Sequence, residues 1–319
     1  MISVSSDEET SYDGQNASSF VLPNPNGKAG GACTLARLKV LRDAEGSKGL
    51  TYSDVLTKMR ADLQERGVGQ IPQLTASESL AIRAPFLLND GKGTARALLV
   101  GIHYVGEKNE LSGCHGDVRN MHQYLTEVAG VDEDEIMVLM DDDECPLPSK
   151  MNIINAWKEL VEDSEAGDSV FFHFSGHGGR IRDEGPSEES DGYDETICPV
   201  DYAEAGQIRD DDIYKILCEP MAKGVAVTVL MDSCHSGTVL DLPYTVKADE
   251  VGGKKFMPLK NTSKSAKYFG EIAIDGKKRV SAPSTPVRSS GVKSDVKRVP
   301  STPSTETSII DDDASKASC

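Results

Sequence analysis

Short apolar segments with two different spacings alternate along residues 95–231 of this 319-residue chain. Nearly continuous apolar runs, which are typical of buried strands, occur at 95–102, 136–140, 170–174 and 225–231. Between them, residues 118–128, 153–161 and 213–217 carry apolar side chains at helical spacing. This alternation predicts an α/β fold with a mostly parallel central sheet flanked by helices.

Residues 30–88 form a second patterned region. Apolar side chains from Leu35 to Leu41 and from Tyr52 to Leu63 have the spacing of amphipathic helices. A short extended piece follows at 70–75, and its proline favours an edge position in a sheet. We therefore expect two helices and a strand ahead of the alternating region.

Polar composition sets the two ends of the chain apart. Residues 1–28 lack an amphipathic period, and residues 246–319 are rich in Ser, Thr, Pro and Lys. Neither segment has enough apolar surface to repay the entropy of ordering a chain. We expect a disordered N-terminus and a largely disordered tail.

Acidic residues outnumber basic ones by 52 to 34, and most of the excess lies within residues 90–246. Such a region repels phosphate backbones and favours cations, which excludes nucleic acid and favours metal ions or basic peptides as partners. No basic, apolar leader and no membrane-length apolar run is present, so we expect a cytoplasmic protein without a membrane partner. The seven cysteines are odd in number and include no C-x-x-C pair, which favours reduced thiols over zinc ligands.

Two of the apolar runs end in turns that carry chemically reactive side chains. The first continues into Ser175-Gly176-His177-Gly178, and the second into Asp232-Ser233-Cys234-His235. The carboxyl ends of neighbouring parallel strands line one crevice, so His177 and Cys234 can meet there. A thiol with a pKa near 8.5 becomes an effective nucleophile when an imidazole takes its proton. The alternative is a buried cysteine and an unrelated loop histidine.

Five strings of residues together resemble the metacaspases, caspase-like cysteine peptidases of family C14. They are 172–178 around His177, 232–237 around Cys234, 111–117, 191–201 and 241–244. The resemblance implies the caspase-haemoglobinase fold, with a large-subunit-like catalytic region at 95–245. Residues 30–88 resemble the small-subunit-like region, so the order of the two is similar to that of type III metacaspases. The small region of the family begins with a strand and a Ser-Gly-Cys motif, which residues 18–30 do not match.

The same resemblance implies roles for individual residues. His177 and Cys234 would form the catalytic dyad, with the backbone N–H groups of Gly178 and Cys234 as the oxyanion hole. Asp117, Ser175 and Asp232 would line the pocket for P1, the substrate residue before the cleaved bond, and would select Arg or Lys. Turn or helix capping is the alternative for both aspartates, and turn formation for the serine.

A calcium site is the other implication. By resemblance the ligands are Asp194, Asp210, Asp211 and Asp241, and Ca²⁺ prefers such oxygen donors. On sequence alone, the acidic start of a helix is the alternative for Asp210 and Asp211. The acidic run 141–144 lacks ligand spacing and is interpreted as a solvated loop.

The remaining histidines do not indicate a metal site. No second pair of ligands lies at zinc spacing from His173 and His235. We interpret His173 as a core residue, and His103, His115 and His235 as structural. Cys114 is interpreted as a small buried residue.

These observations predict a calcium-stimulated cysteine endopeptidase that cleaves protein or peptide substrates after Arg or Lys and is active as a monomer. The family resemblance connects such proteolysis with stress or cell death. Two alternatives belong to other classes: an inactive metacaspase homologue that acts as a binding or scaffold protein, and a calcium-responsive acidic scaffold whose tail recruits partners. An intact pair of His177 and Cys234 favours the enzyme.

Overall fold

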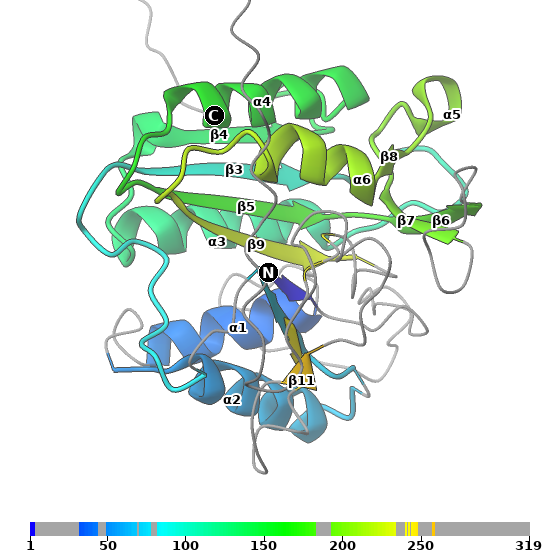
Figure 1. The fold of residues 1–319 in the computed structure, drawn as a ribbon. Helices are drawn as coiled ribbons and strands as arrows, with labels where there is room; N and C mark the ends of the chain where they lie inside the picture. The colour runs from blue at the N-terminus through cyan, green and yellow to red at the C-terminus, as the bar shows by residue number, and fades with distance from the viewer. Residues whose placement is uncertain are drawn as a thin grey trace, which may run out of the picture.

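Eight strands form one mixed sheet at the centre of the molecule (Figure 1). The computed structural model describes residues 1–3, 32–43, 49–68, 70–77, 82–182, 193–233, 240, 242, 244–247 and 257–258. The strand order is β11 (Met257–Pro258), β10 (Tyr244–Lys247), β2 (Gln73–Ala76), β1 (Ile2–Ser3), β9 (Ala226–Asp232), β5 (Ser169–Ser175), β3 (Ala95–Gly101) and β4 (Ile136–Met140). The neighbouring strands β1, β9, β5, β3 and β4 are parallel to one another, which confirms the predicted α/β class. The strands β2, β10 and β11 pair antiparallel with their neighbours.

Helices cover both faces of the sheet. Their bounds are α1 (Ala32–Asp43), α2 (Tyr52–Glu65), α3 (Cys114–Glu127), α4 (Lys150–Asp163), α5 (Tyr202–Ala205) and α6 (Asp210–Ile213), with a 3-10 turn η2 (Glu133–Glu135) and a π-helical turn η3 (Tyr214–Cys218). In Figure 1, α4 and α6 lie on one face, α3 and α1 lie on the other, and α2 packs outside α1. Apolar side chains between these layers form two large buried clusters, one on each face of the sheet.

A small antiparallel sheet projects beyond the carboxyl ends of the central strands. It consists of β6 (Gly178–Arg182), β7 (Tyr193–Ile197) and β8 (Ile208–Arg209). The sequence pattern did not predict it, because β6 is short and its side chains are only half-buried or exposed. Its position matters because β6 begins directly after His177.

The chain start departs from the sequence-based expectation. Residues 1–28 were expected to be disordered, which is wrong for Ile2–Ser3, since this strand pairs with β9 on one side and β2 on the other. Two residues are too short a window for any periodicity, so only the tertiary pairing specifies them. The strand β2 is accordingly an interior strand, and the predicted edge position is also wrong. Residues 4–31 lie outside the described part of the chain.

A strand at the chain start also bears on the missing Ser-Gly-Cys motif. The first strand and Ser-Gly-Cys motif of the family's small region have no match at residues 18–30, whereas β1 precedes that stretch and joins the sheet directly beside β9. The helices α1 and α2 and the strand β2 then follow as predicted. The assignment of these residues as a small-subunit-like region stays a prediction. At the other end of the chain, β10 and β11 show that part of residues 246–319 joins the sheet.

The amino ends of the strands carry a polar clamp centred on Asp168, which precedes β5. Its carboxylate accepts hydrogen bonds from the backbone N–H of Thr94 at 2.8 Å and of Glu165 at 3.0 Å, and it pairs with Arg96 at 2.7 Å. The Glu165 N–H, helped by the Arg96 guanidinium, lowers the pKa of Asp168 from its usual value of 3.8. The clamp joins the starts of β3 and β5.

We expect Asp168→Asn to lower the free energy of unfolding by about 1–3 kcal/mol at neutral pH, because a charged acceptor is lost. A carboxylate with a lowered folded-state pKa stabilises above its unfolded value and loses this contribution as the pH falls through the folded pKa. The difference from wild type should therefore be constant above about pH 5 and shrink below about pH 3.8. Urea unfolding across this range tests it, with the exposed Asp134→Asn as control; a difference that does not depend on pH would contradict it.

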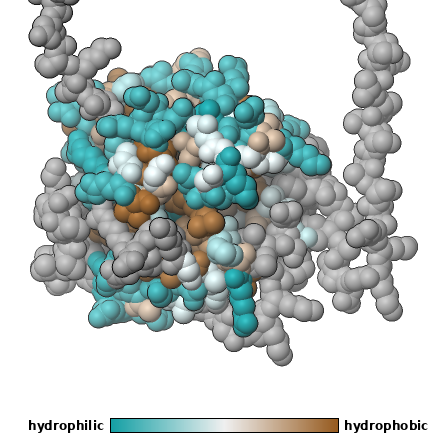
Figure 2. All heavy atoms as spheres, turned by 90° about the vertical axis from the view of Figure 1, so that its left-hand side faces the viewer, coloured by the Kyte–Doolittle hydropathy of each residue, from teal (hydrophilic) through white to brown (hydrophobic). Residues whose placement is uncertain are grey.

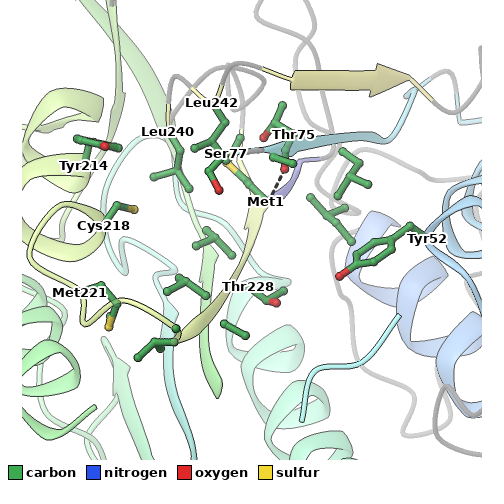
Figure 3. Close-up of a pocket in the computed structure, with 18 of the residues that line it drawn as sticks. Met1, Tyr52, Thr75, Ser77, Tyr214, Cys218, Met221, Thr228, Leu240 and Leu242 are labelled. Carbon is green, nitrogen blue, oxygen red and sulfur yellow. Dashed lines mark hydrogen bonds between the residues drawn. The ribbon is translucent and has the colours of Figure 1, made fainter. Parts of the chain in front are cut away.

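The face at which the strands begin has an apolar centre surrounded by hydrophilic residues (Figure 2). A cavity of about 420 Å³ adjoins the amino half of β9 and is lined mainly by apolar side chains, among them Met221, Val227 and Leu240 (Figure 3). This cavity lies at the opposite end of β9 from Asp232 and is therefore separate from the turns that carry the predicted chemistry. None of the helices in the described segments is long and apolar enough to cross a membrane.

Candidate active site

The register of the central strands brings the two reactive turns to one edge of the sheet. Ser175, the last residue of β5, pairs with Asp232, the last residue of β9. His177 follows two residues after Ser175, and Cys234 follows two residues after Asp232. The parallel pairing therefore supports the predicted meeting of the turns, although Cys234 and His235 themselves lie outside the described residues.

The imidazole of His177 is fixed by contacts from the loop after β3. Its Nε2 lies 2.7 Å from the carbonyl oxygen of Asn109. A carbonyl only accepts hydrogen bonds, so Nε2 carries the proton and Nδ1 is left with its lone pair. The ring also lies against that of Tyr104, with centroids 4.6 Å apart and planes tilted by 36°. A histidine held in this tautomer can take a proton through Nδ1.

Gly178, the predicted oxyanion-hole residue, is the first residue of β6 and pairs with Ile197 of β7. The backbone carbonyl of His177 accepts a hydrogen bond from the N–H of Cys198 at 3.0 Å. The small sheet thus anchors the backbone on the far side of His177. The second predicted donor of the oxyanion hole, the backbone N–H of Cys234, lies outside the described residues.

The three predicted P1-pocket residues lie together at the carboxyl edge of the sheet. The hydroxyl of Ser175 donates to the carboxylate of Asp117 at 2.9 Å, and Ser175 pairs in register with Asp232. Asp117 is fully buried, and Asp232 is 8% exposed. Both buried carboxylates thus neighbour Ser175, one through its hydroxyl and the other through the strand pairing.

A close helix–strand approach positions Asp117. Gly101 ends β3, and a Cβ atom there would lie 2.7 Å from a methyl group of Val118 and 2.9 Å from the carbonyl oxygen of Cys114. Its missing side chain allows the first turn of α3 to reach the strand end. Because Gly101 pairs with Ser175, this approach brings Asp117 to the Ser175 hydroxyl.

Asp232 is held by a residue nearly two hundred positions earlier in the chain. Its Oδ2 accepts hydrogen bonds from the hydroxyl of Thr34 at 2.7 Å and from the backbone N–H of Thr34 at 3.1 Å. Thr34 is fully buried in α1. The first helix of the chain therefore fixes one wall of the predicted pocket, a role that the sequence analysis did not assign.

Buried histidines and cysteines behave largely as predicted. His173 is fully buried, and burial, helped by nearby Arg37, lowers its pKa to about 3, so it stays neutral in the core. Cys114 is buried as well, and Cys114, Cys145, Cys198 and Cys218 are free thiols. These four agree with the expected reduced state.

The acidic run 141–144 is not entirely a solvated loop. The side chain of Asp141 is only 4% exposed and lies 2.6 Å from Nε2 of His115. The rings of His115 and His103 stack with centroids 3.5 Å apart. The interpretation of Asp141 as solvated is therefore wrong, because its partners come from residues 103–115, which a local charge pattern cannot reveal.

Three of the predicted calcium ligands lie on the neighbouring elements β7 and α6, and their carboxylates have protein partners. Asp194 on β7 pairs with Arg209, and Asp211 on α6 pairs with Lys215 at 3.0 Å. Asp210 is fully buried and accepts from the N–H of Asp211, which agrees with the alternative of an acidic helix start.

The donor chemistry of these carboxylates suits a hard cation such as Ca²⁺. Within the described ranges, however, no group of three acidic, His or Cys side chains is arranged to hold a metal ion. The fourth predicted ligand, Asp241, is outside those ranges. The described carboxylates alone therefore do not make up a metal site.

Known proteins match this chain, one of them over most of its length and the others over about half of it. Residues 95–243 match the family model for the metacaspase, peptidase C14 domain. Metacaspase III c of Phaeodactylum tricornutum is 48% identical over 280 residues, which span 86% of this chain and 82% of that protein. Metacaspase-1B of Aspergillus fumigatus is 51% identical over 154 residues, 48% of this chain and 38% of that protein. A crystal structure of a Geobacter sulfurreducens protein matches with a TM-score of 0.37 and 32% identity over 46% of this chain and 53% of that one.

Proposed function

Because this chain belongs to the metacaspase family and is a cysteine-type endopeptidase, we propose that it cleaves protein substrates after Arg or Lys with Cys234 as nucleophile and His177 as base. The observation that carries the proposal is the paired end of β5 and β9, from which both residues follow at the same spacing. The contact of His177 Nε2 with Asn109 supports Nδ1 as the atom that takes the thiol proton.

The proposed reaction proceeds by acyl transfer. The Cys234 thiolate attacks the substrate carbonyl carbon, and the N–H groups of Gly178 and Cys234 stabilise the oxyanion. The C–N bond then breaks as His177 returns its proton to the leaving amine. Water, deprotonated by His177, attacks the acyl-enzyme and releases the carboxylate product and the free thiol.

The buried carboxylates support the preference for basic residues. Asp232 ends β9 and Asp117 lies in the first turn of α3, while Ser175 at the end of β5 donates a hydrogen bond to Asp117 and pairs in register with Asp232. A guanidinium or ammonium group would neutralise their mutual repulsion, whereas an acidic P1 residue would add to it.

We also propose that Ca²⁺ stimulates the enzyme through Asp194, Asp210, Asp211 and Asp241. Support comes from the neighbouring placement of the first three on β7 and α6 and from their oxygen donors. When bound, the ion would neutralise these carboxylates. Arg209 and Lys215 now pair with two of them, so binding would have to displace these cations.

The proposal predicts that the purified protein cleaves a fluorogenic peptide ending in Arg or Lys at least about tenfold faster than the matching Asp peptide. Calcium should raise this rate and a chelator should lower it. Asp210→Asn should weaken the calcium response, while the exposed Asp134→Asn should leave it unchanged.

Each outcome decides a separate part of the proposal. Faster cleavage after Asp would overturn the assigned P1 pocket. Equal Arg cleavage with calcium and with chelator would overturn the calcium site and leave the dyad standing.

A further inference from the structure

Tyr104 has an unusual backbone conformation that places its phenol against the backbone of His177. Its φ is +55°, the one positive value among the non-glycine residues that the structure describes, and its side chain is 1% exposed. Residues other than glycine, asparagine and aspartate rarely adopt this conformation. Its phenol oxygen accepts a hydrogen bond from the N–H of His177 at 2.9 Å and donates to the carbonyl oxygen of Cys198 at 2.6 Å.

The reactive turn is shaped to accommodate this phenol. A Cβ atom on Gly176 would lie 3.0 Å from the Tyr104 hydroxyl and 2.9 Å from the ring of Phe174. Any side chain at position 176 would therefore push the hydroxyl away from His177. The absence of one at Gly176 allows Tyr104 to join the His177 turn to the loop before Cys198.

The carboxylate of Asp141 holds Tyr104 in this conformation. Its Oδ2 accepts from the N–H of Tyr104 at 2.6 Å, and its Oδ1 accepts from the N–H of His103 at 2.7 Å and contacts His115 Nε2 at 2.6 Å. Burial acts to raise the pKa of Asp141, but these hydrogen bonds outweigh it and lower the pKa. A buried charged acceptor with several donors can offset the cost of the left-handed backbone.

Both contacts to the His177 ring come from this one anchored loop. Residues 103–111 are closed by a hydrogen bond from the N–H of Leu111 to the carbonyl of His103 at 2.7 Å. Tyr104 supplies the stacked ring, and Asn109 supplies the carbonyl that fixes Nε2. A shift of the loop would therefore change both the position of the imidazole and which of its ring nitrogens carries the proton.

We propose that Tyr104 is a positioning residue for His177, and that Asp141 acts on His177 through Tyr104. The inference deepens the proposed function and rests on the role of His177 as base. It assigns a part in catalysis to the end of β4, where Asp141 contacts residues 103–105 and His115.

The test compares Tyr104→Phe, Asp141→Asn, the double variant and the matched control Tyr214→Phe, which removes a phenol hydroxyl near the distant cavity. We expect Tyr104→Phe to lower kcat for the Arg peptide about tenfold with KM within about twofold, because the ring stays while two hydrogen bonds are lost. The double variant should be no slower than Asp141→Asn alone, since both act through one contact. Unchanged kcat in Tyr104→Phe, or additive losses in the double variant, would overturn the proposal.

An NMR measurement separates this inference from the proposed function. In protein with ¹³C-labelled histidine, the His177 ring signals, assigned with His177→Gln, should shift in Tyr104→Phe and Asp141→Asn but not in Tyr214→Phe. Unmoved signals would overturn the positioning role even in a protein that shows no peptidase activity. Absence of Cys234-dependent cleavage with the expected shifts would overturn only the proposed dyad.

Discussion

Cys234→Ala is expected to lower kcat for the Arg peptide by about 10⁴-fold or more, and His177→Ala by a similar factor. Without the thiol no acyl-enzyme can form. Without the imidazole no base takes the thiol proton and no acid protonates the leaving amine. Both variants should unfold at the wild-type urea midpoint, because both residues come after the ends of their strands in the sequence rather than within β5 or β9.

The double variant provides the sharper test of a dyad. Residues that act as a unit are not additive, so removal of both should cost little more than removal of either. Cys145→Ala and His122→Ala are matched controls, since each removes the same side-chain type from a half-buried place away from β5 and β9. If the losses of the two single variants multiplied in the double variant, or if Cys234→Ala cleaved the Arg peptide at close to the wild-type rate, the nucleophile or the base would lie elsewhere.

The residues that were predictable from the sequence lie at the ends of strands with strong local patterns. Most residues of β5 and β9 are apolar, and such runs are typical of strands buried on both faces. Once these two strands are neighbours, the turns that follow them must share an edge. The placement of Ser175 beside Asp232 thus follows from pattern and topology alone.

The residues that the sequence analysis missed have partners far away in the chain. Thr34 contacts a carboxylate 198 positions later, and Tyr104 contacts His177 73 positions later. Each has an ordinary local context: Thr34 lies within a helix, and Tyr104 follows an apolar strand. One local signal for Tyr104 was available, since Gly176 in the reactive turn indicates that something approaches the backbone closely there.

Charge patterning failed at Asp141 for a related reason. A run of four acidic residues is normally solvated, and Asp143 and Glu144 are indeed exposed. Asp141 directly follows β4, however, and backbone N–H groups at the end of neighbouring β3 are oriented toward it. The position of a residue relative to a strand end therefore decided its role more than the charge of its neighbours.

The charge of the proposed P1 pocket leads to the second large effect. Asp232→Asn is expected to lower kcat/KM for the Arg peptide by on the order of 10²–10³, because removal of one partner from a buried ion pair costs several kcal/mol. A peptide with citrulline at P1 keeps the shape of arginine without its charge. Wild type should discriminate strongly between the two peptides, and Asp232→Asn should lose most of this discrimination.

Thr34 extends the argument from the pocket to the helix that supports it. Thr34→Val keeps the shape and the backbone N–H but removes the 2.7 Å hydrogen bond to Asp232. The carboxylate would lose one of the contacts that orient it, so we expect KM for the Arg peptide to rise about five- to tenfold. Thr57→Val on the exposed face of α2 is the matched control, since its hydroxyl donates only to the helix backbone of Ser53. If Asp232→Asn lowered cleavage after Arg and citrulline equally, Asp232 would be structural, and Thr34 would then stabilise the contact of α1 with β9 rather than substrate selection.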